Sequence, residues 1–383
     1  MGDSMSLPNN AQAWLDQWGM ALKRMTCKNC AAEFLLAADQ AEPVCPNCFR
    51  ANLELASEPQ LNNAPSVIPA FSTPEQFLPF QVSEAGLQGG WQRFVQGLWF
   101  PPQDLKIDNL MKRLQACYLP TWLVDSQVQA NWQAEAGFNY QVVSHKDRYD
   151  DFRGGWRSQE VTETRQRWEP RLGHLHRSYT NIPAPALEDQ PDLAQRLGTY
   201  DLNHTLLYQK DVAFKNADRI PWVIRLPDRT PQDSWKDALP GFIQTAGEEC
   251  RRACGADYIR SFRWAANYTS QNWTLLLLPA LFTYYLDDER NLHVLSINGH
   301  TGRLFGVRRA SMGKARSVAL WIALAGALVF IASLVGFAFS VVLPVLSLLA
   351  GLGLLLTLIL GLCAVIPLLV VWGTNRKPAV YQG

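Results

Sequence analysis

The sequence predicts a multidomain chain with an N-terminal zinc ribbon, a central α+β domain with antiparallel strands, and a C-terminal two-helix transmembrane hairpin. Three observations support this fold class. Four of the eight cysteines form two closely spaced pairs near the N-terminus. The middle of the chain mixes helical and strand-like apolar periods. Residues 317–375 contain no Asp, Glu, Lys, Arg or His.

With 383 residues, the chain has room for two or three units. Its 35 basic and 34 acidic residues leave it nearly neutral, and its 14 Trp imply large aromatic packing or interface surfaces. The expected parts are an N-terminal helix and zinc ribbon over 1–57, a proline-rich linker over 58–75, a central α+β cytoplasmic domain over 76–310, transmembrane helices over 317–339 and 342–372, and a cytoplasmic tail over 373–383.

The N-terminal segment does not have the pattern of a secretory signal, because Asp3 and Asp16 interrupt it and no long apolar core is present. Trp14, Trp18 and Leu22 recur at helical spacing, which predicts a helix over Ala11–Met25. This helix would pack on the ribbon or offer a face to a partner.

The two cysteine pairs are Cys27 with Cys30 and Cys45 with Cys48, separated by 14 residues. Each CxxC pair can supply two of the four ligands of a tetrahedral zinc. Two pairs together fill all four positions, which makes the site structural, with no open position. The alternatives are a pair of disulfides or a redox CxxC, and a cytoplasmic location argues against disulfides. Ala31 and Phe49 stand where zinc knuckles often have Gly, so we expect a less regular knuckle geometry.

The charge of this region bears on nucleic-acid binding, which many zinc ribbons perform. Residues 1–62 contain four basic and seven acidic residues. A domain that grips phosphates should be basic. We therefore expect protein contacts and do not expect nucleic acid as a partner.

The middle of the chain predicts alternating helices and strands. Ser83 is an expected N-cap for a helix that carries Leu87, Trp91 and Leu98 on one face. Strict alternation over Thr121–Ala136 predicts a long, half-solvated strand. Further expected elements are strands over Val161–Trp168, Gly173–Tyr179 and Arg303–Val307, a helix over Gly241–Cys254, and a hairpin of Thr274–Leu286 with His293–Ile297.

Catalytic motifs are absent from the sequence. There is no GxxxxGK[ST] loop, no HExxH and no GxSxG. His174 and His176 could bind metal from one strand face, but solvent-exposed histidines are the favoured interpretation. Cys250 and Cys254 could ligate or oxidise, but buried small hydrophobes are favoured, and residues 287–289 are expected to form a solvated turn. We therefore predict that the chain is not an enzyme.

The uncharged run is long enough for two membrane crossings, because about 20 apolar residues span a bilayer core. It divides near Ser340–Pro344, where only a few residues would form the loop. Small residues would let the two helices approach closely; they are Ala325, Gly326, Gly336, Gly351, Gly353 and Gly361. A hairpin buried in a soluble core is the alternative.

Basic residues flank the run on both sides, whereas the loop carries no charge. By the positive-inside rule, both ends of the hairpin face the cytoplasm. The flanking basic residues are Arg308, Arg309, Lys314 and Arg316 before the run, and Arg376 and Lys377 after it.

Several short segments together resemble a known family. They are the ribbon and, in chain order, 78–80, 91–101, 118–122 with Asp125, 168–170 with Gly173, 278–279 with 284–285, and 297–302. This order resembles bacterial zinc-ribbon membrane proteins that are often labelled primosomal-helicase-like or TFIIB-type zinc-ribbon proteins. The resemblance implies association with membrane-stress modules that contain SPFH (flotillin-like) or PspA-type proteins, and it supplies no catalytic residues.

These observations lead to one functional hypothesis and two alternatives. The hypothesis is a cytoplasm-facing adaptor with one structural zinc ion, held in a bacterial inner membrane with both termini cytoplasmic. It would recruit or assemble protein partners such as SPFH/flotillin-like or PspA-like proteins, and an oligomer is compatible with it. The alternatives are a membrane-tethered nucleic-acid-binding zinc ribbon and a membrane enzyme with a site in the central domain.

Overall fold

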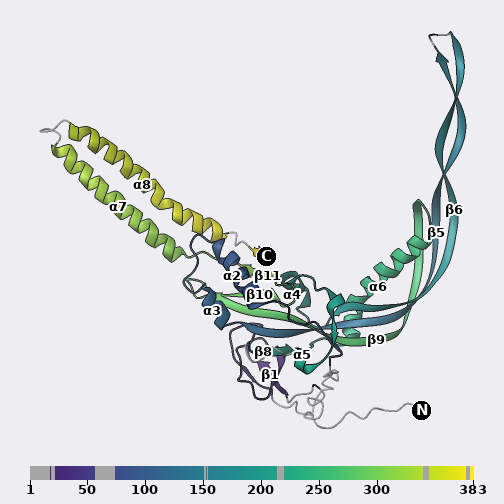
Figure 1. Cartoon of the computed structure of the whole chain (residues 1–383), viewed down its shortest axis with the longest axis horizontal. Helices are drawn as coiled ribbons and strands as arrows, with labels where there is room; N and C mark the ends of the chain where they lie inside the picture. Colours follow the sequence, from purple (N-terminus) through teal and green to yellow (C-terminus); the bar gives the residue numbers. More distant parts are fainter. Residues whose placement is uncertain are drawn as a thin grey trace. The chain divides into compact units, whose positions relative to one another are not determined.

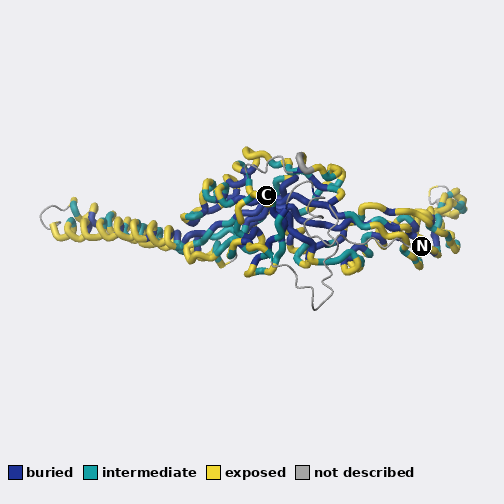
Figure 2. The backbone as a smooth tube through the Cα atoms, turned by 90° about the horizontal axis from the view of Figure 1, so that it is seen from below, coloured by how far each residue is buried: buried dark blue, intermediate teal, exposed yellow. Residues whose placement is uncertain are grey.

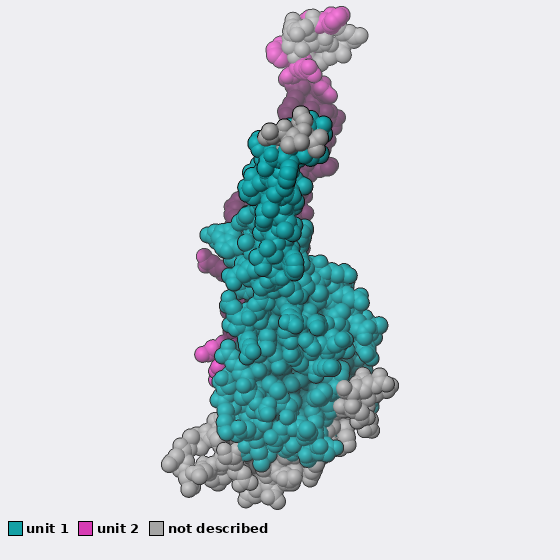
Figure 3. Space-filling model, turned by 90° about the vertical axis from the view of Figure 1, so that its left-hand side faces the viewer, with its two compact units in different colours: residues 1–120, 189–226, 276–383 teal, residues 121–188, 227–275 magenta. Residues whose placement is uncertain are grey.

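The computed structural model describes residues 18, 22–56, 74–150, 152, 154–213, 220–339, 345–376 and 380–383. The chain divides into two compact units (Figure 3). Unit 1 comprises residues 1–120, 189–226 and 276–383, and unit 2 comprises residues 121–188 and 227–275. Two long strands, β5 (Gln115–Asp150) and β9 (Tyr258–Leu286), contribute residues to both units.

A mixed β-sheet organises the chain, in the strand order β12-β11-β10-β9-β5-β8-β2-β1-β3. Most neighbouring strands are antiparallel, as predicted, but β5 pairs parallel with β8 and β4 pairs parallel with β9. The other strands are β1 (Leu22–Cys27), β2 (Glu33–Ala37), β3 (Leu53–Leu55), β4 (Gln76–Phe77), β6 (Gly155–Pro185), β7 (Leu206–Leu207), β8 (Trp222–Arg225), β10 (Leu292–Asn298), β11 (Leu304–Val307) and β12 (Val380–Gln382).

The cysteine-bearing segment belongs to this sheet. Strand β1 pairs with β2 and β3, and β2 pairs in turn with β8. The sequence predicts the ribbon and the central domain as separate parts, whereas the structure joins their strands edge to edge. The connection is β8, whose four residues are all buried and which was not among the predicted strands.

The prediction of a helix over Ala11–Met25 is wrong at its C-terminal end, because residues 22–25 lie in β1. Leu22 and Met25 are both fully buried although they lie on opposite faces of the strand. A strand covered on both faces can bury residues three apart, which imitates the helical period. Ala11 and Trp14 lie outside the described residues, as does the linker before Pro74.

The helices of unit 1 lie on the apolar residues of the sheet. Helix α2 (Glu84–Gln96) begins as predicted at Ser83, whose hydroxyl accepts a hydrogen bond from Gly86 N at 3.1 Å. Its buried face carries Trp91 and Phe94, which join one core with residues of β9, β10 and β11. The shorter helices are α3 (Ile107–Lys112), α4 (Gln190–Leu197), η2 (Leu202–His204) and α5 (Lys210–Ala213).

Unit 2 is built on the long hairpin of β5 and β6. The predicted alternation is confirmed, since Val128, Ala130 and Trp132 are buried while Gln129 and Asn131 between them are exposed. Two separate strands were predicted where the structure has only β6. Pro170 does not interrupt β6, because this strand pairs only with β5 among the described strands and so needs no donor on its outer edge.

Helix α6 (Pro231–Ala253) packs on this hairpin and starts ten residues before the predicted position. Thr230 caps it by accepting from Asp233 N, and Pro231 occupies the first turn. Its C-terminal end at Gly255, which has a φ of +60°, agrees with the sequence.

Two cross-strand contacts between Trp and Gly join the strands of the hairpin. A Cβ added to Gly173 would lie 2.6 Å from the ring of Trp132 on β5. A Cβ added to Gly137 would lie 2.9 Å from the ring of Trp168 on β6. Each Trp ring therefore covers the bare backbone of a glycine on the opposite strand.

The C-terminal helices are α7 (Met312–Phe339) and α8 (Val345–Arg376), which lie side by side (Figure 1). Both are long and apolar enough to cross a membrane. At 28 and 32 residues they are about 42 and 48 Å long, more than the roughly 30 Å of a bilayer core. Most of their surface is exposed, in contrast to the strands at the core of unit 1 (Figure 2). Ser340–Pro344, and with it the predicted start of the second helix, lies outside the described residues.

Candidate functional site

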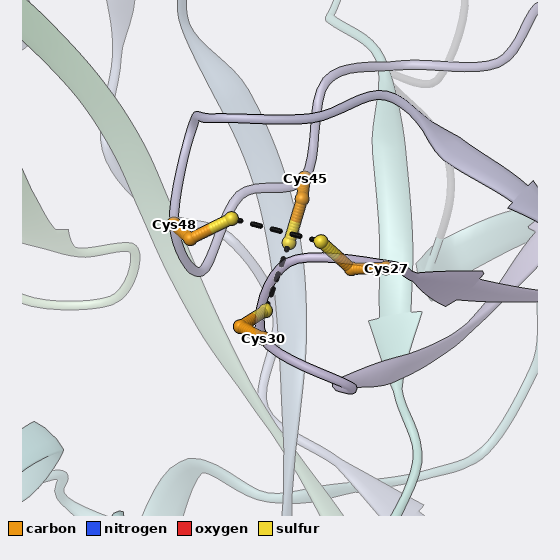
Figure 4. Close-up of side chains that lie close together, drawn as sticks. All are labelled: Cys27, Cys30, Cys45 and Cys48. Atoms are coloured by element: carbon orange, nitrogen blue, oxygen red, sulfur yellow. Dashed lines mark hydrogen bonds between the residues drawn. The ribbon is translucent and has the colours of Figure 1, made fainter.

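The four cysteine side chains point toward one another (Figure 4). Cys27 ends β1, Cys30 follows in a turn, and Cys45 and Cys48 belong to a second turn before β3. All four sulfur atoms lie within 4.8 Å of one another, and the Cys27–Cys48 and Cys30–Cys45 sulfur pairs are each 3.6 Å apart. A tetrahedral ion with metal–sulfur bonds of about 2.3 Å needs sulfur–sulfur separations of about 3.8 Å. This cluster could therefore bind a metal ion.

The turns around the cysteines are regular, contrary to the expectation from Ala31 and Phe49. These two residues have left-handed φ angles of +57° and +52°. Ala31 N donates to Cys27 O at 2.8 Å, and Phe49 N donates to Cys45 O at 2.8 Å. Both turns thus take the backbone that glycine usually supplies, although the left-handed region costs an ordinary residue roughly 1–2 kcal/mol.

Packing explains why Phe49 stands at such a position. Its side chain is buried, and its ring lies 5.0 Å from the ring of Tyr284 in β9, centroid to centroid. A glycine would relieve the backbone but would lose this contact. The second turn is therefore fixed both by its cysteines and by an aromatic contact to the sheet.

The electrostatics of the cluster favour a cation. Burial raises the pKa of the Cys45 thiol far above its ordinary value, and the neighbouring Cys30 and Cys48 raise it further. At Cys27 burial acts in the same direction, but hydrogen bonds from the backbone of Cys30 and Asn29 outweigh it and lower the pKa. Four thiolates at this spacing repel one another, and a bound metal ion removes that penalty while keeping them deprotonated.

The membrane-flanking arginines before α7 are held by the protein. Arg308 donates to the carbonyl oxygens of Phe94 and Arg93 at 2.9 and 2.7 Å, and its guanidinium lies 4.2 Å from the ring centroid of Tyr381. Arg309 donates to Asn375 O at 2.8 Å. These two cations therefore have structural contacts in addition to their charge.

The remaining flanking residues are disposed differently. Lys314 and Arg316 are exposed on the first turns of α7 and have no ion pair among the described residues. The Arg376 guanidinium lies 5.0 Å from the ring centroid of Trp372. Lys377 lies outside the described residues.

Asn375 joins the start of α7 to the end of α8. Its side chain accepts from Ala310 N and donates to Ala310 O, both at 2.9 Å. Beyond it, β12 pairs antiparallel with β11, the strand that precedes α7. The two helices thus begin and end at one place on unit 1. The sequence predicted only a tail over 373–383, since the three residues of β12 are too few to give a periodic signal.

The turn of residues 287–289 is more organised than predicted. Asp287 accepts from Glu289 N, Asn291 N and His293, and these bonds lower its pKa although burial acts in the opposite direction. Asp288 accepts from Ser311 Oγ at 2.8 Å and from Gly313 N at 2.9 Å. This carboxylate therefore caps the N-terminus of α7, where a negative charge is favourable.

The other candidate metal or redox residues do not form a cluster. His174 and His176 are exposed on β6, and Cys250 and Cys254 are buried on α6 among apolar side chains. Burial raises the pKa of both thiols, which makes them less reactive. Within the part of the chain that the structure describes, the four ribbon cysteines are the one group of three or more potential metal ligands.

No family model, curated protein or solved structure matches this chain.

Proposed function

We propose that the chain is a membrane-anchored adaptor that presents a zinc-stabilised ribbon to protein partners at the cytoplasmic face of a bacterial inner membrane. The observation that carries this proposal is the joined base of α7 and α8 beside a sheet that also contains the ribbon. One rigid attachment would then hold the ribbon strands close to the membrane.

Zinc is the metal that the donor set favours. Four cysteine sulfurs in a roughly tetrahedral arrangement suit zinc, although such a set also suits iron. The two CxxC turns are separated by 14 residues, slightly fewer than the usual separation of about 15–20 in structural zinc ribbons. With all four positions taken by cysteine, the ion would stabilise the fold and would have no open position for a substrate.

A hairpin topology is supported from both ends of the helices. The Asn375–Ala310 hydrogen bonds and the β11–β12 pairing support a topology in which the start of α7 and the end of α8 lie on one side of the membrane. Lys314, Arg316 and Arg376 lie at these ends, so the positive-inside rule assigns that side to the cytoplasm.

The adaptor role is supported by the position of the ribbon in the sheet. Strand β3 ends the strand order, and its outer edge is bonded at Leu53, whose N donates to Pro43 O at 3.0 Å. Leu55 on β3 is 67% exposed. An exposed apolar side chain at the end of this strand suits contact with another protein, including the SPFH-type or PspA-type proteins that the family resemblance implies.

Co-purification from detergent tests the proposal. The full chain, a Cys27→Ser/Cys48→Ser variant and a Cys363→Ser control should all remain in the membrane fraction, and a fluorescent reporter fused after Gly383 should report a cytoplasmic C-terminus. We expect the ribbon variant to lose zinc and its protein partners, and the control to keep both. Identical partners from all three proteins would reject the ribbon as the binding element, and a periplasmic reporter would reject the topology.

A further inference from the structure

A polar cleft of about 750 Å³ lies beside the first turns of α7 in unit 1. Its walls come from the segment before α3, the turn between β9 and β10, and the start of α7. The volume falls in the range of about 300–1,000 Å³ that is typical of small-ligand sites.

Three cations line this cleft without a carboxylate partner. Lys106, Arg290 and Lys314 are exposed, and none forms an ion pair among the residues that the structure describes. They come from three different elements, so the fold brings them together around one space. Lysine and arginine in such an arrangement are suited to a phosphate group.

Three carboxylates also line the cleft, but two of them are already fully engaged. Both oxygens of Asp104 accept hydrogen bonds, including two from Arg113 at 2.6 and 2.9 Å. Both oxygens of Asp287 accept as well, from the backbone of its own turn and from Asn291 and His293.

Asp288 differs from these two carboxylates. Its Oδ2 caps α7, whereas its Oδ1 has no hydrogen-bond partner in the described part of the chain. The exposed Asp288 therefore keeps one acceptor for a cationic group. The cleft thus offers a site for a phosphate and, separately, a site for an ammonium.

The position of the cleft at the start of α7 indicates that its ligand is a lipid headgroup. Lys314 and Ser317 both line it, and the uncharged run begins at Ser317. If α7 enters the bilayer at that residue, the cleft opens at the level of the lipid headgroups. A phosphate in the cleft would then lie within about 5 Å, along the helix axis, of the first residue in the run.

We propose that this cleft binds the headgroup of an ethanolamine phospholipid, with the phosphate on Lys106, Arg290 and Lys314 and the ammonium on Asp288. The binding rests on the membrane anchoring proposed above. It would fix how deeply α7 sits in the bilayer, and so where the sheet and its ribbon stand relative to the membrane surface. An anionic lipid without an amine would leave the free Oδ1 of Asp288 beside its phosphate with no ammonium to neutralise it.

Lipid retention by the full chain tests this proposal. The protein, purified in detergent, is equilibrated with equal amounts of phosphatidylethanolamine, phosphatidylglycerol and phosphatidylcholine, and bound lipid is counted by native mass spectrometry. We expect a preference for phosphatidylethanolamine of about tenfold over the other two, which corresponds to about 1.4 kcal/mol. Asp288→Asn should remove the preference over phosphatidylglycerol while phosphate binding persists, and Lys106→Gln/Lys314→Gln should lose all three lipids.

Matched controls come from residues of α3 that do not line the cleft. Lys112→Gln and Asp108→Asn change exposed charges there and should retain lipid like the unaltered chain. Equal retention of the three lipids, or an Asp288→Asn variant that keeps the preference, would overturn the proposal. Equal binding of soluble glycerophosphoethanolamine and of the lipid would also overturn the proposal.

Resistance of the chain to alkaline extraction from membranes separates the two proposals. A chain that is extracted contradicts the anchor itself. A chain that stays inserted but shows no lipid preference contradicts only the headgroup site.

Discussion

The cysteine ribbon of residues 22–56 and the β5–β6 hairpin are both antiparallel β structures, but they are held in different ways. The ribbon strands β1, β2 and β3 have six, five and three residues, and four sulfurs gather in the turns beside them. The hairpin strands have 36 and 31 residues, and their backbone pairing continues almost without a break. Short strands need a local restraint, whereas long strands gain stability from many repeated cross-strand pairs.

This comparison predicts that one region depends on a metal and the other does not. In the ribbon, the free energy of folding would come largely from a single ion. In the hairpin it would come from contacts such as the Trp132–Gly173 pair, which no chelator affects. The following substitutions test that contrast, from the largest expected effect to the smallest.

Loss of one ribbon thiolate should have the largest effect. Structural zinc contributes an apparent folding free energy of roughly 10–16 kcal/mol in small zinc domains, so Cys45→Ser should release the metal and unfold the ribbon. Hydrogen exchange should lose protection over β1–β3 while β5 and β6 keep theirs, and elemental analysis should show no zinc. Cys250→Ala is the matched control, since this buried cysteine lies in unit 2 outside the cluster. Loss of protection in β5 and β6 with Cys45→Ser would contradict the prediction that the hairpin does not depend on the metal.

A clash beneath Trp132 should destabilise the hairpin and leave the metal in place. Gly173→Val would put a Cβ 2.6 Å from the indole ring, and overpacking of this kind costs about 1–3 kcal/mol. Denaturant unfolding followed through unit 2 should shift by this amount, with zinc content unchanged. Gly155→Val on the same strand is the control, because no heavy atom lies within 4 Å of its added Cβ. Equal shifts from both variants would show that strand propensity, and not the Trp contact, is responsible.

A smaller and opposite effect is expected at Ala31. Its φ of +57° is unfavourable for alanine and free for glycine, so Ala31→Gly should stabilise the metal-bound ribbon by about 0.5–1 kcal/mol after the entropy of the unfolded glycine is counted. The measurement is the chelator concentration that removes half of the zinc, which should rise. Ala32→Gly, at the next residue and without a positive φ, should lower it. If both variants shifted the chelator midpoint in the same direction, backbone strain at Ala31 would not explain the shift.

The contrast also explains which features the sequence could predict. The cysteine spacing, the alternation of Val128, Ala130 and Trp132, and the apolar run are periodic or local patterns, and each is present in the structure. The helix cap at Ser83 is a local signal of the same kind. Such patterns can be read without knowledge of the neighbouring strands.

The features that the sequence did not predict depend on pairing between distant segments. Strand β8 joins the ribbon to the sheet, and Asn375 bonds to Ala310 across the whole hairpin of α7 and α8. The sequence predicted that Asp288 lies in a solvated turn, because its hydrogen-bond partners Ser311 and Gly313 belong to a later segment of the chain. The sequence does not show whether a single polar residue at the end of an apolar run bonds to a distant segment or lies in a free C-terminal tail.

The smallest effect is expected from the charges along the hairpin. Glu163 on β6 lies 3.1 Å from Lys146 on β5 and 3.5 Å from Arg165, and hydrogen bonding to Lys146 lowers its pKa. A lowered pKa means that any stability from Glu163 is present above the ordinary Glu value of about 4.3 and is lost as the pH falls through the lower, folded value. Because the Glu163 side chain is partly exposed and that of Lys146 is largely exposed, salt screens the pair, and Glu163→Gln should leave thermal unfolding nearly unchanged at neutral pH. Unfolding at low and high salt, at neutral and acid pH, measures this. A large salt-dependent loss would show that ion pairs, rather than the Trp–Gly contacts and the backbone ladder, stabilise the long hairpin.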